Sequence, residues 1–186
     1  MEYLSKIKKF VDASFVNAGD TYDLKHFERT VYWLLQLKSD ADEALQVAAY
    51  GHDIERAFRE RNYNKISQNE QGFISREHLS HHQETGAQII ADFLTKQGAP
   101  GSFVSKVKNL IEHHEIGGND KDNLLKDADS LSYFENQIDK FIKNKVAEAG
   151  KSKVKQKFDW MFDRITSEKA KQIAKPMYEN AIKRLG

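Results

Sequence analysis

Apolar residues recur at mixed spacings of three and four along most of the chain, which is the pattern of helices that bury one face. The first such segment, residues 2–17, carries Leu4, Ile7, Phe10, Val11 and Phe15. A second follows Asp20 and Thr21, two residue types that cap helices, and a third runs from about Ala41 to Phe58. Residues 60–75 are polar and aperiodic. We expect a long loop there, and loops of that length often act as lids over a site.

The same helical pattern continues in the second half of the chain. Further helices are expected at about Arg76–Gln97, Ser102–Glu115, from Asp120 onward, at 152–165 and at 167–184. Glycines near positions 98 and 117 separate the first three of these segments. We find no internal repeat, low-complexity tract or linker. The sequence therefore predicts one all-α domain over residues 1–186, with a helical core at about 20–135 and a C-terminal extension at about 136–186.

Composition narrows the range of functions. The 186 residues are enough to bury a hydrophobic core, and 31% of them are charged. No apolar run approaches the length of a membrane span, and the first fifteen residues do not resemble a signal peptide. We therefore expect a cytoplasmic protein with no membrane partner. Lys and Arg number 29 against 28 Asp and Glu, so no net charge favours nucleic acid as a partner.

The chain contains no cysteine. This excludes disulfides, thiolate zinc sites and a cysteine nucleophile. Any metal ion must be bound through nitrogen and oxygen, which suits Mn, Fe, Co, Zn or Mg.

The His52-Asp53 pair directly follows a small apolar helical run. Neighbouring side chains diverge by about 100° on a helix, so both reach one ion only if it lies between their directions. Further ligands must then come from other helices. The alternative is an ordinary surface hydrogen bond within a common dipeptide.

Two other segments place titratable residues on helices. Asp23, His26 and Arg29 are three residues apart and line one side of a helix. Asp23 could hold the imidazole of His26 or could simply cap the helix, and the Arg29 guanidinium could bind a phosphate. The string Asp127-Ala128-Asp129 puts carboxylates into an apolar stretch. A buried Asp129 would need compensation such as a metal ion, whereas at the edge of the stripe it would be solvated.

These three strings, D-x-x-H-x-x-R, A-x-x-H-D and D-A-D-x-L, resemble the signatures of the HD superfamily of phosphohydrolases over residues 20–135. The resemblance implies an all-helical, metal-dependent enzyme that hydrolyses a small phosphoester, with nucleotides as the substrate class. It also implies that a divalent ion is held by His26, His52, Asp53 and Asp129. Asp129 is preferred to Asp127 because the family ligand stands second in D-A-D. Motifs of other phosphate-binding and hydrolytic families are missing.

Two further strings resemble the branch of this superfamily that binds a second metal ion. His82 begins an H-x-x-x-G-A segment that includes Gly86, and His113 begins an H-H-E stretch. No G-Y-P follows, so a cyclic-dinucleotide phosphodiesterase is not expected. We favour one tightly held ion, with His82 and His113 beside the substrate. Ligation of a second ion and simple packing are the alternatives, and His114, on an apolar stripe, is interpreted as a core residue.

We therefore expect a phosphohydrolase in which Asp53 orients the attacking water and His82 and His113 take part in catalysis. Arg29, Arg56 and Lys126 are the expected contacts to the substrate phosphate. One alternative is a non-catalytic module that binds a metal or senses a ligand. The other is an oxygenase with paired iron, which would require a set of six ligands. The oligomeric state is not indicated.

Overall fold

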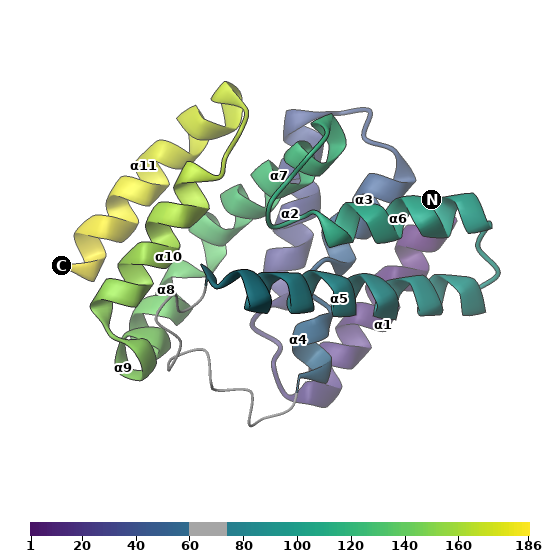
Figure 1. Cartoon of the computed structure of the whole chain (residues 1–186), viewed down its shortest axis with the longest axis horizontal. Helices are drawn as coiled ribbons and strands as arrows, with labels where there is room; N and C mark the ends of the chain where they lie inside the picture. The colour runs from purple at the N-terminus through teal and green to yellow at the C-terminus, as the bar shows by residue number, and fades with distance from the viewer. Residues whose placement is uncertain (60–73) are drawn as a thin grey trace.

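The computed structural model describes residues 1–59 and 74–186, and within these ranges every regular element is a helix (Figure 1). The all-α prediction is confirmed. The elements are α1 (Glu2–Ala18), α2 (Leu24–Leu37), α3 (Glu43–Gly51), α4 (Glu55–Phe58), α5 (Arg76–Lys96), α6 (Gly101–Glu112), α7 (Asp120–Asn136), α8 (Ile138–Lys140), a π-helical turn (Phe141–Lys145), α9 (Val146–Ala149), α10 (Lys151–Asp163) and α11 (Glu168–Leu185). Residues 60–73, most of the predicted lid, lie outside the described residues. None of the described helices is both long and apolar enough to cross a membrane.

Helix α7 lies between two hydrophobic clusters. The first cluster is formed by α1, α2, α3, α5, α6 and the beginning of α7, where Leu125 and Ala128 are fully buried. The second contains the end of α7 together with α10 and α11, which lie side by side at the C-terminal end of the molecule (Figure 1). Leu131 and Phe134 belong to this second cluster. Because α7 is covered on both sides, polar residues in its middle are buried as well.

The predicted helix from Ala41 to Phe58 is interrupted at the His52-Asp53 pair. Helix α3 ends at Gly51 and α4 begins at Glu55. Between them the Ile54 N–H donates to Gly51 O at 3.1 Å, and the Arg56 N–H donates to Asp53 O at 3.0 Å. These bonds span three residues, so the backbone is wound more tightly than an α-helix. His52 and Asp53 therefore lie in a tight turn and not in a regular α-helix, where their side chains would diverge by about 100°.

Helix α5 packs directly on this turn through a glycine. A Cβ atom at Gly86 would lie 3.2 Å from the carbonyl oxygen of His52. That separation is tighter than ordinary van der Waals contact, so the absence of a side chain allows the close approach. Gly86 of the H-x-x-x-G-A segment therefore lets the backbone of the turn approach α5 closely.

Helix α6 is shorter than predicted, because it ends at Glu112 and not at Glu115. The chain then turns until Gly117, whose φ of 81° lies in the left-handed region that favours glycine. This early end brings His114 and Glu115 inward, and both are buried. The Glu115 N–H donates to the side-chain oxygen of Gln83 on α5 at 3.0 Å.

The first carboxylate of the D-A-D string holds the start of α11. The Asp127 carboxylate accepts hydrogen bonds from the backbone N–H groups of Thr166 at 2.7 Å and Ser167 at 2.8 Å. Ser167 is the N-cap of α11. Both carboxylate oxygens of Asp127 are therefore used in connecting α7 to the start of α11.

We expect Asp127→Ala to lower the free energy of unfolding by about 1–3 kcal/mol, because two backbone N–H groups lose their acceptor. Metal binding should be unchanged. Urea unfolding followed by circular dichroism measures the effect. Asp163→Ala is the matched control, since Asp163 is an exposed carboxylate and its loss should change stability by less than about 0.5 kcal/mol. A variant at Asp127 that kept full stability but lost metal would contradict this assignment.

Candidate metal centre

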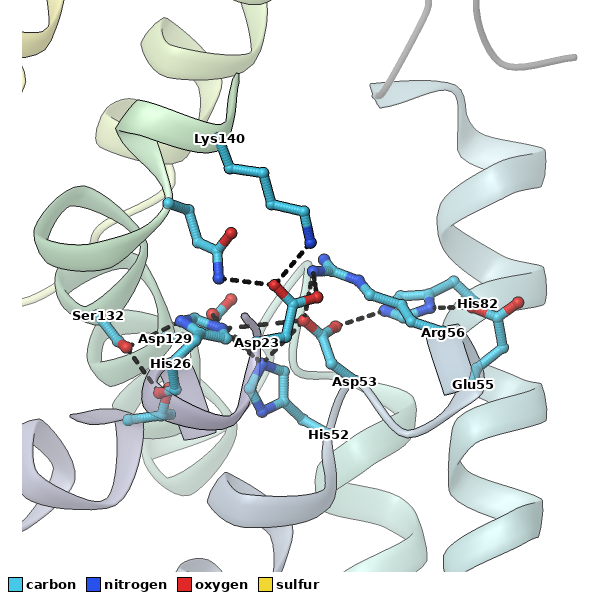
Figure 2. Close-up of polar contacts among 12 residues, drawn as sticks. Asp23, His26, His52, Asp53, Glu55, Arg56, His82, Asp129, Ser132 and Lys140 are labelled. Atoms are coloured by element: carbon cyan, nitrogen blue, oxygen red, sulfur yellow. Dashed lines mark hydrogen bonds and ion pairs between the residues drawn. The ribbon is translucent and has the colours of Figure 1, made fainter. Parts of the chain in front are cut away.

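Four side chains from three parts of the chain meet at one point (Figure 2). His26 comes from α2, His52 and Asp53 from the turn after α3, and Asp129 from α7. His26 Nε2 lies 3.3 Å from His52 Nε2, and these two atoms lie 3.1 and 3.3 Å from Asp129 Oδ1. Asp53 Oδ2 lies 3.8 Å and 3.5 Å from the same two nitrogens. Ligands about 2.1 Å from one tetrahedral ion are about 3.4 Å apart. His26, His52 and Asp53 form a group that could hold one ion, and Asp129 lies within the same range of both imidazoles.

Hydrogen bonds to Nδ1 determine which nitrogen of each imidazole faces the centre. His52 Nδ1 lies 3.0 Å from Ala49 O, and a carbonyl oxygen can only accept, so Nδ1 carries the hydrogen. The Ser132 hydroxyl donates to His26 O at 2.8 Å and therefore accepts from His26 Nδ1, also at 2.8 Å. Both rings thus present Nε2 to the centre, which is the arrangement typical of metal-ligating histidines.

A second group of ligands shares Asp53 with the first. Its other oxygen, Oδ1, lies 2.8 Å from His82 Nε2 and 3.8 Å from His114 Nε2. His82 Nδ1 donates to Glu55 at 2.8 Å, and His114 Nδ1 donates to Ile111 O at 2.7 Å. Figure 2 shows Asp53 between His26 on one side and His82 on the other.

The two groups together form a buried His/Asp cluster that is compatible with metal binding. The Nε2 atom of His114 has no hydrogen-bond partner among the residues that the structure describes. A buried imidazole nitrogen without a partner is costly unless something binds it. The six candidate ligands are His26, His52, Asp53, His82, His114 and Asp129.

His114, and not His113, joins the cluster. His113 lies at the C-terminal end of α6, where its Nδ1 donates to Asn109 O at 2.8 Å, and it belongs to neither ligand group. The early end of α6 at Glu112 is the physical reason, because the following turn points the second histidine inward. The apolar stripe on which His114 lies was the available signal, but it was interpreted as packing.

Asp23 does not hold the imidazole of His26, because Ser132 takes that place. The Asp23 carboxylate instead accepts from Gln137 Nε2 at 3.0 Å and from Lys140 Nζ at 2.9 Å. It is buried, so these contacts compensate its charge.

Of the three predicted phosphate contacts, the structure brings one to the centre. A terminal nitrogen of Arg56 lies 2.9 Å from Asp53 Oδ2. Arg29 pairs with Glu135 at 2.8 Å, and Lys126 donates to Thr166 Oγ1 at 2.9 Å. No hydrogen bond or ion pair among the described residues joins Arg29 or Lys126 to the six candidate ligands.

Two cations from the C-terminal helices also lie at the centre, and the sequence interpretation missed them. Arg164, just after α10, pairs with Asp129 and with Glu115. Lys157 of α10 is buried. Burial lowers the pKa of Lys157 to about 8, against the opposing effect of Glu115. Both residues stand among aromatic core positions, a context that indicated packing only.

The electrostatics of the cluster keep its two aspartates ionised and His114 neutral. Burial raises the pKa of Asp53, but Arg56 and His52 outweigh it and hold this pKa well below the usual range. Asp129 is held low in the same way, against burial, by Arg164 and His52. Burial lowers the pKa of His114 to about 4, so its ring is neutral and able to ligate.

One family profile, described as a domain of unknown function (DUF4202), matches residues 10–185. The chain belongs to this family. No curated protein and no solved structure matches it. The DUF4202 match includes all six candidate ligands and also α10 and α11. Lys157 and Arg164 therefore lie within the DUF4202 region, as the ligands do.

The second ligand group revises the expectation of a single ion: we now expect the purified protein to bind two divalent ions per chain, one in each group. His114→Ala should leave one ion, because the second group keeps only His82 and the shared Asp53. His113→Ala is the matched control and should leave two ions. Elemental analysis after dialysis against Mn²⁺ measures the stoichiometry. Equal metal content in the two variants would refute the assignment of His114.

Metal affinity should increase with pH. Burial opposes a charge on His52, but Asp53 and Asp129 raise its pKa to about 9. An incoming ion must displace this proton, since only the neutral imidazole ligates. We expect the affinity for Mn²⁺ to rise about tenfold per pH unit between about pH 7 and 9, measured by chelator competition under argon. An affinity that is flat over this range would contradict the prediction.

The proton on His52 also contributes to the stability of the metal-free protein. The folded-state pKa of His52 lies above its ordinary value of 6.5, so protonation stabilises the fold fully below pH 6.5. This contribution is lost as the pH rises through about 9. The Tm of the metal-free protein should fall over that window, and Mn²⁺ should reduce the fall.

Proposed function

We propose that this protein is a metal-dependent phosphohydrolase that acts on a small phosphoester, with nucleotides as the substrate class. The observation that carries the proposal is a buried His/Asp cluster with three cationic side chains beside it, those of Arg56, Lys157 and Arg164. The resemblance of three sequence strings to the HD superfamily supports the same reaction. The cations suit a substrate that brings negative charge to the centre.

The cluster has the donors for two ions. His26, His52, Asp53 and Asp129 would hold the first, and Asp53, His82 and His114 the second. A divalent ion, when bound, supplies a Lewis acid for a phosphoryl oxygen and lowers the pKa of a nearby water. Hydrolysis then forms one P–O bond to the water oxygen and breaks the bond to the ester oxygen, which leaves with a proton.

The chain's own residues orient the ligands and balance charge. Arg164 binds Asp129 through one nitrogen and Glu115 through another, which fixes the direction of the Asp129 carboxylate. Glu55 accepts from His82 Nδ1 and so directs Nε2 of that ring toward Asp53.

Arg56 is suited to bind the substrate phosphate. Its side chain is 32% exposed, and it lies between the carboxylates of Asp53 at 2.9 Å and Asp23 at 3.7 Å. An ion ligated by Asp53 would compete with Arg56 for the same oxygen. The guanidinium would then be free to turn to the phosphate while Asp23 keeps it at the centre.

A second candidate function is oxygen-dependent chemistry on paired iron. The specific observation in its favour is the set of six candidate ligands, four imidazoles and two carboxylates, in which Asp53 faces both groups. Such a set also suits two ions that hydrolyse a phosphoester. The neighbouring cations favour the hydrolase.

The test is metal analysis of the purified protein followed by phosphate release over a nucleotide panel, with Mn²⁺, Fe²⁺, Co²⁺, Zn²⁺ and Mg²⁺ in turn. We expect turnover with at least one ion. Asp53→Ala should reduce turnover by about a thousandfold or more, because both ligand groups lose the shared carboxylate. Asp163→Ala is the control for substitution of a remote carboxylate.

Circular dichroism should show that the Asp53 variant keeps its helices. Normal turnover and full metal content in that variant would refute the role of Asp53. Oxygen consumption by the iron-loaded protein, without phosphate release on any nucleotide, would favour the second candidate. The absence of both activities would leave a metal-binding or ligand-sensing module.

A further inference from the structure

Lys157 is a buried cation that forms no ion pair with any carboxylate in the described part of the chain. Its exposed fraction is 6%, and among the described residues its ammonium makes no hydrogen bond or ion pair. It lies over the ring of Trp160, 4.3 Å from the ring centre. Arg56 and Arg164, the other cations of the centre, each pair with a carboxylate. A buried charge without a paired partner is costly, so Lys157 calls for an anion that the described chain does not provide.

Within the described ranges, Tyr133 is a second buried donor for which no acceptor is found. Its exposed fraction is 4%, and its hydroxyl has no hydrogen-bond partner within the described part of the chain. Buried tyrosine hydroxyls usually find one. Tyr133 stands four residues after Asp129 on α7, so the two side chains lie on the same face of that helix.

Both donors lie beside the metal centre. The electrostatic neighbours that Lys157 and Tyr133 share are Arg56, Glu115, Asp129 and Arg164. Lys157 Nζ lies 4.3 Å from the centre of the Trp160 ring, and the guanidinium carbon of Arg164 lies 4.7 Å from the same centre. Arg164 in turn binds the candidate ligand Asp129. The ring of Tyr133 lies 6.2 Å from that of Phe158, the residue next to Lys157.

We propose that Lys157 and Tyr133 form a subsite that binds a phosphate group of the substrate beside the metal centre. The inference rests on the proposed function and names the residues that recognise its substrate. A phosphate has several acceptor oxygens and up to two negative charges, so one group can satisfy the ammonium and the hydroxyl together. Arg56 and Arg164 each pair with a carboxylate of the centre. Lys157 makes no such pair among the described residues, so it adds to Arg56 a second cation that can offset the charge of the phosphate. Helix α10 thereby takes part in substrate recognition.

The test is the binding of inorganic phosphate to the Mn²⁺-loaded protein, measured by isothermal titration calorimetry. Lys157→Met should weaken binding about 10- to 100-fold, the range for a lost hydrogen bond to a charged group. Tyr133→Phe should weaken it by about 3- to 10-fold, because the lost donor is neutral. The matched control is Lys155→Met on the same helix. Lys155 is exposed and pairs with Asp159 at 2.7 Å, so its loss should leave phosphate affinity within about twofold.

Two further measurements separate recognition from a structural role. The Tm of Lys157→Met should equal or exceed that of the unchanged protein, since an apolar side chain relieves the burial of an unpaired charge. Its Mn²⁺ affinity should be equal or higher, because a cation near the ions has been removed. A residue that served only packing or ligand placement would lower one or both values. If Lys157→Met does not fold, the phosphate affinity of Tyr133→Phe decides: a loss supports the subsite, and an unchanged affinity overturns it.

The outcomes distinguish this subsite from the proposed function. Phosphate binding that is equal in Lys157→Met and the unchanged protein would overturn the subsite, as would a Mn²⁺-loaded protein that does not bind phosphate. Turnover with an unaltered KM in Lys157→Met would refute the subsite and leave the hydrolase standing. Phosphate binding that depends on Lys157, in a protein that releases phosphate from no ester, would support the subsite and refute the proposed reaction.

Discussion

The Asp53 carboxylate requires positive charge at both of its oxygens, and the arrangement of the centre follows from this requirement. It is buried on the turn between α3 and α4, where an uncompensated charge would destabilise the fold. Oδ2 faces Arg56 and the imidazoles of His26 and His52, and Oδ1 faces His82. Helices α2, α5 and the α3–α4 connection therefore meet at one carboxylate, so the electrostatics of the site and the packing of the core are inseparable.

Helix α7 links this centre to the C-terminal helices. Two residues apart on α7, Asp127 caps α11 and Asp129 faces the imidazoles. Arg164, between α10 and α11, returns to bind Asp129. The C-terminal helices are thus joined to the centre by a cap and an ion pair as well as by apolar contact. In a chain that belongs to the DUF4202 family over residues 10–185, these helices contribute charged groups to the centre and cannot be regarded only as a packing extension.

Much of the fold was predictable, because the long helices keep their apolar periodicity and several of the breaks, such as those at Gly19, Gly98 and Gly117, fall at glycines. Four of the candidate ligands could also be picked out from the sequence, since His26, the His52-Asp53 pair and Asp129 stand in recognisable local strings. The sequence could not show whether His113 or His114 joins the cluster, because this depends on where α6 ends. Helix ends depend on tertiary contacts such as that of Glu115 with Gln83. Arg164 and Lys157 were missed because their burial comes from the docking of α10, which no local string encodes.

The contact between Gly86 and the carbonyl of His52 has a consequence for the choice of metal. His82 stands one helical turn before Gly86 on α5, and His52 belongs to the first ligand group. The spacing of the two groups is therefore fixed where one main chain rests on another. Side-chain rotation cannot widen such a contact, and the tightly packed interior resists its compression. If the cluster binds two ions as proposed, the two ligand groups could not approach more closely than this contact allows. Ions too small for that spacing would have to lengthen their own bonds.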